Sequence, residues 1–187
     1  KFGVSILLPL FGVDLDIATV LLAMIPFFTI LFTPLFGALV DKVGKATLWM
    51  IVGSAMVLVS HLIITFAPQG EPMYAYIAIA LLGIGYSLVP SAMWPSVPKI
   101  IPEKNLGTAY SLIYWVQNLG MWAVPIYVGR IFKNTITEAG NATQEISAAI
   151  RAEYVFIFLG IIAIATALML YFSSKRHPEL RLDKAAK

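Results

Sequence analysis

Residues 17–67 read IATVLLAMIPFFTILFTPLFGALV (17–40), DKVGKA (41–46) and TLWMIVGSAMVLVSHLIITFA (47–67), and this stretch decides the fold. Each of the two apolar runs is long enough to cross a lipid bilayer as a helix, which takes about 20 residues. The connection between them is short and carries three charges. The stretch therefore predicts two antiparallel membrane-spanning helices joined by a tight turn in the aqueous phase.

Three more apolar segments of similar length follow, at about 74–95, 108–129 and 152–172. Residues 17–172 are thus expected to form one all-α, polytopic bundle of five transmembrane helices, with proline-containing or polar loops between them. We expect residues 1–16 to hold the end of a preceding helix and an outer loop. Residues 173–187 are expected to form a charged, soluble cytoplasmic tail.

The composition of the chain agrees with a membrane protein. Hydrophobic residues make up 59% of the sequence and charged residues 12%, and the mean hydropathy is +0.85. Soluble domains carry about twice that share of charge, so the apolar excess is expected to face lipid. Because the sequence has no cysteine, disulfides, thiolate metal sites and cysteine nucleophiles are excluded.

The basic residues are distributed unevenly between the two sides of the predicted bundle. Nine of the 13 lie on one side: Lys42, Lys45, Lys99, Lys104, Lys175, Arg176, Arg181, Lys184 and Lys187. The other side holds Lys1, Arg130, Lys133 and Arg151, together with Asp14, Asp16, Glu71, Glu138, Glu145 and Glu153. The positive-inside rule then predicts a cytoplasmic C-terminus. This pattern explains the net charge of +3 without a nucleic-acid partner.

The segment 108–129 is the most polar of the five. At helical spacing Tyr110, Tyr114, Gln117 and Met121 form one stripe, and Asn118 lies beside it. Two interpretations stay open. The polar stripe can line a water-filled cavity, or it can form hydrogen bonds to a neighbouring helix. Likewise, Trp94 can anchor its helix at the membrane interface or form an aromatic wall of the cavity.

Other polar positions indicate packing. Gly83, Ser87 and Ser91 are four residues apart, which predicts a face that a neighbouring helix approaches closely. His61 stands alone in an apolar segment and is either a proton relay or a satisfied structural histidine. All ten acidic residues are expected at or beyond the ends of the spans, and the segment 152–172 is expected to face lipid on every side. No metal-ligand cluster or catalytic motif is present in the sequence, so we expect no metal, no cofactor and no enzymatic activity.

The connection after the first span contains Gly37, Asp41, Gly44 and Lys45 in the pattern G-x-x-x-D-x-x-G-[RK]. It resembles the loop signature of the major facilitator superfamily, in the version found between the eighth and ninth helices. Three further segments, Ala92–Pro95, Leu106–Tyr110 and Gln117–Gly120, resemble the branch of the lysosomal dipeptide uniporter and its bacterial relatives.

The resemblance implies helices eight to twelve of a twelve-helix secondary transporter, which moves a small solute by alternating access. The solute is expected to be a small peptide or another organic metabolite. Alternatives are a drug or sugar transporter of the same superfamily, a non-transporting scaffold or receptor, or a membrane enzyme. The expected partners are the lipid bilayer, the solute and a missing N-terminal helix bundle of the same protein. A bacterial inner membrane is favoured over a lysosomal one. The loop is expected to act as a conformational switch in which Asp41 contacts the missing half, away from the solute.

Overall fold

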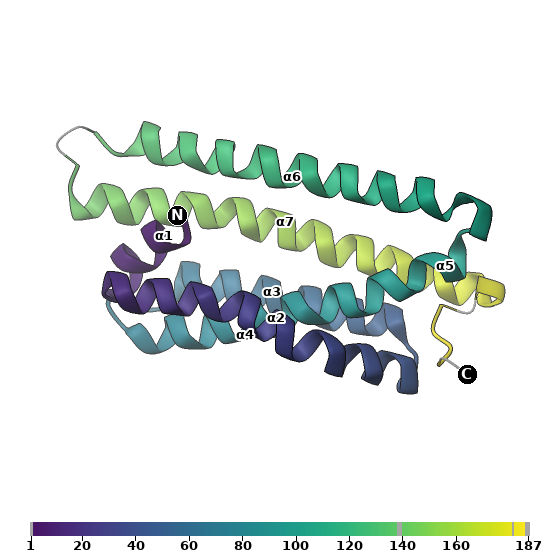
Figure 1. Cartoon of the computed structure of the whole chain (residues 1–187). Helices are drawn as coiled ribbons and strands as arrows, with labels where there is room; N and C mark the ends of the chain where they lie inside the picture. Colours follow the sequence, from purple (N-terminus) through teal and green to yellow (C-terminus); the bar gives the residue numbers. More distant parts are fainter. Residues whose placement is uncertain (1, 138–139, 181, 186–187) are drawn as a thin grey trace.

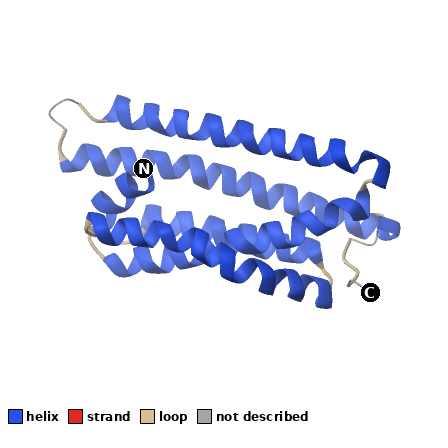
Figure 2. Cartoon of the chain, in the orientation of Figure 1, coloured by secondary structure: helices blue, strands red, loops and turns tan. Residues whose placement is uncertain are grey.

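The computed structural model describes residues 2–137, 140–180 and 182–185, and within these ranges it contains helices and loops but no strand (Figure 2). The α-helices are α1 (Phe2–Phe11), α2 (Leu15–Val43), α3 (Ala46–Phe66), α4 (Pro72–Met93), α5 (Val97–Ile100), α6 (Leu106–Thr135) and α7 (Ala142–Arg176). Three 3₁₀ turns are also present: η1 (Trp94–Ser96), η2 (Glu103–Asn105) and η3 (Pro178–Leu180). The expected all-α fold is confirmed. Lys1, Glu138, Arg181 and Lys187, which entered the charge comparison above, lie outside the described residues.

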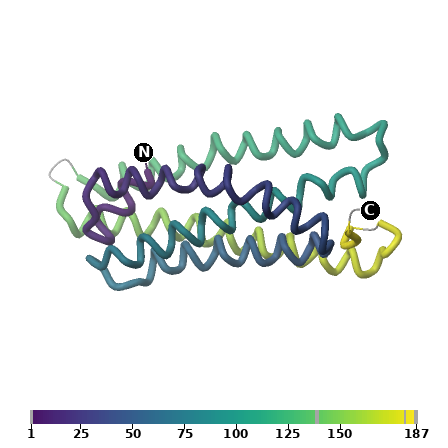
Figure 3. Tube along the Cα trace, turned by 60° about the horizontal axis from the view of Figure 1, so that its bottom comes forward, coloured from purple at the N-terminus to yellow at the C-terminus, as the bar shows by residue number. Residues whose placement is uncertain are grey.

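The long helices run alongside one another as an elongated bundle (Figures 1 and 3). The N-terminus and the short helix α1 lie at the end that carries the α6–α7 connection, and the C-terminus lies at the opposite end (Figure 1). Helix α4 packs between α2 and α3, and α7 packs on α3 and α1. Helix α6 lies at the edge of the bundle beside α7 (Figure 1).

Four segments in the described part of the chain are long and apolar enough to cross a membrane: α2, α3, Pro72–Ile100 and α7. Helix α6 has 30 residues, which exceeds the length that a span requires. It falls outside this group because of its polar composition, the feature that distinguishes the segment 108–129 in the sequence. That α6 also crosses the membrane stays a prediction.

Small residues allow the closest helix contacts. A Cβ atom added to Gly85 of α4 would lie 2.8 Å from the carbonyl oxygen of Gly53 on α3. Gly83, Ser87 and Ser91 of α4 are buried, and the Ser91 hydroxyl donates a hydrogen bond of 3.2 Å to the carbonyl oxygen of Thr33 on α2. The prediction that this stripe is a packing face is confirmed. Without side chains to separate them, the backbones of α3 and α4 come together and exclude lipid.

The helical structure continues further along the chain than the hydropathy pattern predicts. Residues 96–100, expected to belong to a proline-containing loop, continue the helical structure as the end of η1 and as α5. Pro95 and Pro98 lie in the first turns of η1 and α5. Backbone N–H groups in the first turn of a helix have no acceptor within that helix. Proline, which lacks an N–H, is therefore tolerated at these positions. Helix α6 continues to Thr135 and α7 begins at Ala142, so the polar connection between them is much shorter than expected.

The expectation that the last span faces lipid on every side is wrong. One face of α7 carries the small residues Ala149, Ala152 and Gly160, which are buried. A Cβ atom added to Gly160 would lie 3.1 Å from the side chain of Leu58 on α3. Residues of α7 therefore pack on α3 and also on α1, and part of the helix faces α6, while much of its remaining surface is exposed.

Candidate functional site

Three of the predicted site residues meet where α4 ends and α6 begins. The Trp94 ring stacks on the Tyr114 ring with a centroid distance of 5.0 Å, and its centroid lies 5.8 Å from that of Tyr110. The Tyr110 hydroxyl also donates a hydrogen bond of 3.4 Å to the carbonyl oxygen of Trp94. Trp94 and Tyr110 are half-buried, whereas Tyr114 is 52% exposed. The cluster therefore offers an open aromatic surface beside α6.

Gln117 and Asn118 lie about one helical turn beyond this cluster, and both are exposed. The Asn118 side-chain amide donates a hydrogen bond of 2.7 Å to the carbonyl oxygen of Tyr114 in its own helix. Neither residue makes a hydrogen bond to another helix within the described ranges. The opposite face of α6 is exposed as well, with Leu112 at 58% and Val116 at 60%. The arrangement thus leaves both faces of the middle of α6 open.

The predicted switch loop divides between two helices. Gly37 and Asp41 belong to α2, whereas Gly44 ends α2 and Lys45 precedes α3. Gly44 and Lys45 have positive φ angles of 71° and 56°. Two consecutive residues with positive φ reverse the direction of the chain between α2 and α3. A Cβ atom added to Gly37 would meet nothing within 4 Å. Asp41 is exposed and forms no hydrogen bond or ion pair with any residue of the described ranges.

The C-terminal tail binds to this loop, which the sequence did not indicate. The Asp183 carboxylate accepts hydrogen bonds from the Thr47 backbone N–H (3.0 Å), from the Thr47 hydroxyl (2.8 Å) and from the Ser174 hydroxyl (3.1 Å). The backbone carbonyl oxygen of Asp183 accepts a further hydrogen bond of 2.9 Å from the Lys45 N–H. Because Thr47 lies in the first turn of α3, Asp183 caps that helix.

Two further contacts hold the tail in place. The Lys99 ammonium, at the end of α5, donates a hydrogen bond of 3.1 Å to the carbonyl oxygen of Lys184. Leu182 is 1% exposed. Residues 182–185 are therefore bound to the end of the helix bundle, a contact that the expectation of a soluble tail did not include; that the tail is cytoplasmic stays a prediction. This short segment joins the start of α3 to the ends of α5 and α7.

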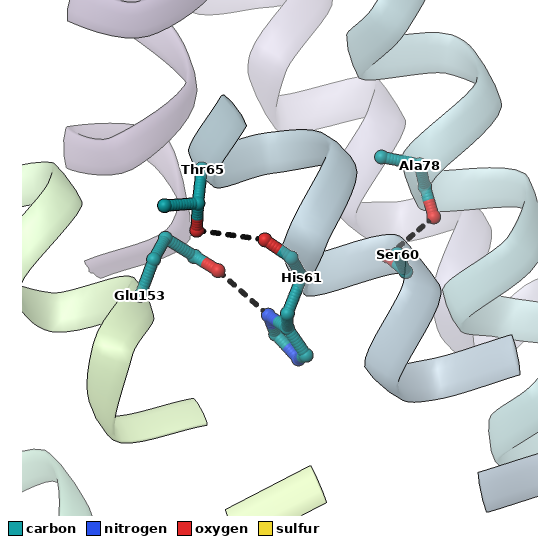
Figure 4. A network of polar contacts seen from close by, with 5 residues as sticks. All are labelled: Ser60, His61, Thr65, Ala78 and Glu153. Atoms are coloured by element: carbon teal, nitrogen blue, oxygen red, sulfur yellow. Dashed lines mark hydrogen bonds and ion pairs between the residues drawn. The ribbon is translucent and has the colours of Figure 1, made fainter. Parts of the chain in front are cut away.

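A buried acid–imidazole pair connects α3 to α7 (Figure 4). The His61 Nδ1 atom lies 2.7 Å from the Glu153 Oε2 atom, and the side chains are 12% and 2% exposed. The His61 ring also stacks on Phe156 with a centroid distance of 5.1 Å. Glu153 lies well inside α7, because that helix begins at Ala142 and not near residue 152; that all ten acids lie at or beyond the ends of the membrane spans stays a prediction.

The pair borders a cavity of about 490 Å³. Apolar side chains from α1, α2, α4 and α7 form most of its lining, and Tyr86 is the other titratable residue among the described lining residues. The described ranges contain no group of three or more histidine, aspartate or glutamate side chains that could hold a metal ion. Glu153 is thus the specific partner of His61, as expected for a structural histidine whose hydrogen-bonding needs are met.

Comparison with known proteins adds two findings. The sequence profile of the Major Facilitator Superfamily matches residues 2–125. The proteins named lysosomal dipeptide transporter MFSD1 from Mus musculus and Homo sapiens are 44% and 42% identical to the chain over 99 residues. The corresponding protein of Danio rerio is 39% identical over the same length.

These alignments cover 53% of the chain and about a fifth of the length of each relative. No solved structure matches the chain. The profile match, in contrast, covers well over half of the chain and includes the loop with Gly37, Asp41, Gly44 and Lys45. The chain is an integral, multi-pass membrane protein segment, and it belongs to the major facilitator superfamily.

Proposed function

We propose that the full-length protein is a secondary transporter of small peptides, which bind near the middle of the bilayer between this bundle and an N-terminal one. The two bundles rock around the bound solute and expose it to each side in turn. Membership of the superfamily supports the general class. The relatives that share 39–44% identity with the chain are named dipeptide transporters, which supports the substrate class.

The observation that carries the proposal is the open polar stripe on α6. Leaving a polar amide unpaired in hydrocarbon costs several kcal/mol, so Gln117 and the exposed part of Asn118 need polar surroundings. No other helix of the described ranges supplies a hydrogen-bond partner for either side chain. A water-filled cavity would solvate them, which favours the cavity over structural hydrogen bonding.

The chemistry of this surface suits a peptide. Side-chain amides both donate to and accept from peptide groups, and the rings of Trp94, Tyr110 and Tyr114 can pack on apolar or aromatic side chains of the solute. We propose that these five residues contribute one wall of the binding cavity. The other wall would come from the missing N-terminal bundle.

Uptake by the purified full-length protein in proteoliposomes tests the proposal. Dipeptides should enter faster than into protein-free liposomes, and a sugar and a cationic drug should not compete with them. Uptake of the sugar or drug alone would assign the protein to another substrate class of the superfamily. Absence of uptake for every solute would favour a scaffold or receptor.

The first predicted effect concerns the two amides. Gln117→Ala and Asn118→Ala should each lower the Vmax/KM of dipeptide uptake by about two- to twelvefold, because each removes a hydrogen bond to the solute worth about 0.5–1.5 kcal/mol. Concentration-dependent uptake measures the effect. Leu112→Ala, on the opposite face of α6, is the matched control. An equal loss from Leu112→Ala would show that the polar stripe has no special role.

The second predicted effect concerns Asp41, which lies in the last turn of α2 and is expected about half a bilayer thickness from the middle of the membrane. We propose that its exposed carboxylate binds a helix N-terminus or an arginine of the missing bundle. Such contacts contribute about 0.3–2 kcal/mol, which corresponds to a shift in a two-state population of up to about thirtyfold.

Asp41→Asn should therefore change the turnover rate several-fold and leave the intrinsic affinity of each state for the solute unchanged. Initial rates of uptake, combined with equilibrium binding to each trapped state, separate the two quantities. The neighbouring exposed residue Lys42 offers a control, since Lys42→Gln should have little effect. A change of intrinsic affinity in Asp41→Asn alone would contradict the assignment.

For the location of the protein we propose a bacterial inner membrane, as expected from the resemblance to the bacterial members of the branch. The names of the animal relatives place those proteins in lysosomes. Fractionation of the native host would decide between the two.

A further inference from the structure

A groove of about 910 Å³ runs between α6 and α7 on the outside of the bundle. Its lining is largely apolar and aromatic: Trp122, Ala123, Val124, Ile126, Tyr127, Arg130 and Ile131 from α6, and Arg151, Tyr154, Val155, Phe158 and Leu159 from α7. Trp122 and Phe158 are 66% and 62% exposed. The face of α7 that packs on α3 carries Ala152 and Gly160, so the groove uses other faces of that helix.

Two arginines line one end of this groove. Arg130 lies in the last two turns of α6 and Arg151 in the third turn of α7. Because the two helices are antiparallel neighbours (Figure 1), both side chains are at the end that carries the α6–α7 connection. Both are exposed, and neither forms an ion pair or hydrogen bond with another residue in the part of the chain that the structure describes. Two uncompensated guanidinium groups therefore share one groove.

The position of these arginines is unfavourable for the protein alone. They lie on the side of the predicted bundle that is poor in basic residues, at the boundary between the polar loop and the apolar run of α7. Two positive charges in one groove repel each other, and a bound anion would offset the free-energy cost of this repulsion. Guanidinium groups bind phosphate oxygens in pairs with good geometry.

The rest of the groove determines what kind of anion fits. Apart from the two arginines the lining is aliphatic and aromatic. Trp122 and Phe158 of this lining are exposed, so they would contact acyl chains in a membrane. Trp122, Tyr127 and Tyr154 are residue types that concentrate at membrane–water interfaces. The volume lies within the range of ligand-binding sites, about 300–1,000 Å³. A soluble phosphate would use the arginines and leave the apolar part of the groove unoccupied.

We propose that this groove binds an anionic phospholipid, with the headgroup phosphate between Arg130 and Arg151 and an acyl chain along Trp122 and Phe158. The lipid would join the otherwise loosely attached α6 to α7. Basic pockets between transmembrane helices on the cytoplasmic side are known to recognise anionic lipid headgroups, and the same guanidinium–phosphate chemistry would apply on the opposite side, where we expect Arg130 and Arg151. The inference depends on the embedding of the helices in a membrane and not on which solute is transported.

Native mass spectrometry of the full-length protein, with phosphatidylglycerol and phosphatidylcholine added in equal amounts, tests the proposal. The protein should retain phosphatidylglycerol at least severalfold more often. Arg130→Gln with Arg151→Gln should abolish the preference. Lys133→Gln, an exposed cation of the same helix that does not line the groove, should preserve it. Equal retention of the two lipids by the unmodified protein, or a preference unaffected by the double substitution, would overturn the proposal.

A second measurement keeps the test valid if the double variant does not fold. Phosphatidylglycerol with brominated acyl chains should quench tryptophan fluorescence more than brominated phosphatidylcholine does, and Trp122→Phe should remove the difference. If a helix from the rest of the protein covered the groove, neither lipid would quench Trp122. That result, or stabilisation by inorganic phosphate equal to that by phosphatidylglycerol, would also overturn the proposal.

Discussion

Glu153→Ala should lower the free energy of unfolding of the full-length protein by about 3–5 kcal/mol, the usual cost of removing one partner from a buried ionisable pair. Glu153 is 2% exposed, and its carboxylate is 2.7 Å from the His61 ring. Alanine would leave the imidazole, which is itself only 12% exposed, without its acceptor between two apolar helices. Glu153→Gln should cost less, because the amide can still form a hydrogen bond to the ring.

A double-substitution cycle separates the pair from its surroundings. Replacing both residues by leucine should destabilise the protein less than either single leucine substitution, since no polar group is then left unpaired. Denaturant titration in detergent, followed by intrinsic fluorescence, measures each variant. Strictly additive effects of the two single substitutions would mean that the hydrogen bond contributes nothing.

The chain contains a matched control for this prediction. His177 and Glu179 form the same type of pair at 2.9 Å, but their side chains are 58% and 66% exposed. Hydrogen bonds lower the pKa of the Glu179 carboxyl: the larger effect comes from the backbone N–H of Glu179 and the smaller from the His177 side chain. Water nevertheless screens the interaction between the two exposed side chains. Glu179→Ala should therefore leave the unfolding transition unchanged. A similar loss from both alanine substitutions would show that burial is not the cause.

Gly44→Ala should release the C-terminal tail from the α2–α3 loop. Gly44 has a φ of 71° and a ψ of −144°, a combination that costs a residue with a Cβ atom about 1–3 kcal/mol. The added Cβ atom would also lie 2.5 Å from the Asp183 carbonyl oxygen and 2.7 Å from the Ala185 nitrogen. Both atoms belong to the main chain of the tail, so the tail has to move away.

A cysteine at position 182 reports this release, because Leu182 is 1% exposed. In full-length protein lacking other cysteines, Leu182→Cys should react slowly with a thiol reagent, and at least tenfold faster when combined with Gly44→Ala. Gly37→Ala is the control within the same motif, because a Cβ atom there meets no other group within 4 Å. Equal reactivity in all three proteins would mean that the tail does not bind the loop.

Hydropathy predicted the helices well wherever apolar runs were long, because burial in lipid depends mainly on composition. It placed the start of α7 ten residues too late. The polar first turns of that helix depend on a local signal, the Asn141 side chain, which accepts a hydrogen bond of 3.0 Å from the Gln144 N–H. Asparagine followed three residues later by glutamine is a recognisable helix start, and it could have placed Glu153 inside the helix.

Other features depend on contacts between distant segments. His61 and Glu153 are 92 positions apart, and Thr47 and Asp183 are 136 apart. A single sequence gives the periodicity of each helix but not the rotation of one helix against another, so it could not pair these residues. The aromatic cluster of Trp94, Tyr110 and Tyr114 was easier to predict, because only a short connection separates the two helices that carry it.

The orientation of α6 is the central claim, and cysteine accessibility tests it most directly. Met121 lies on the polar stripe and Leu112 on the opposite face, and their exposed fractions in this bundle are nearly equal at 59% and 58%. In the full-length protein, Met121→Cys should react with a hydrophilic thiol reagent, and a transported dipeptide should slow the reaction. Leu112→Cys should react slowly, with no effect of the dipeptide. Protection of Leu112→Cys by the dipeptide, with Met121→Cys unreactive, would place the cavity on the other side of the helix and contradict the proposed site.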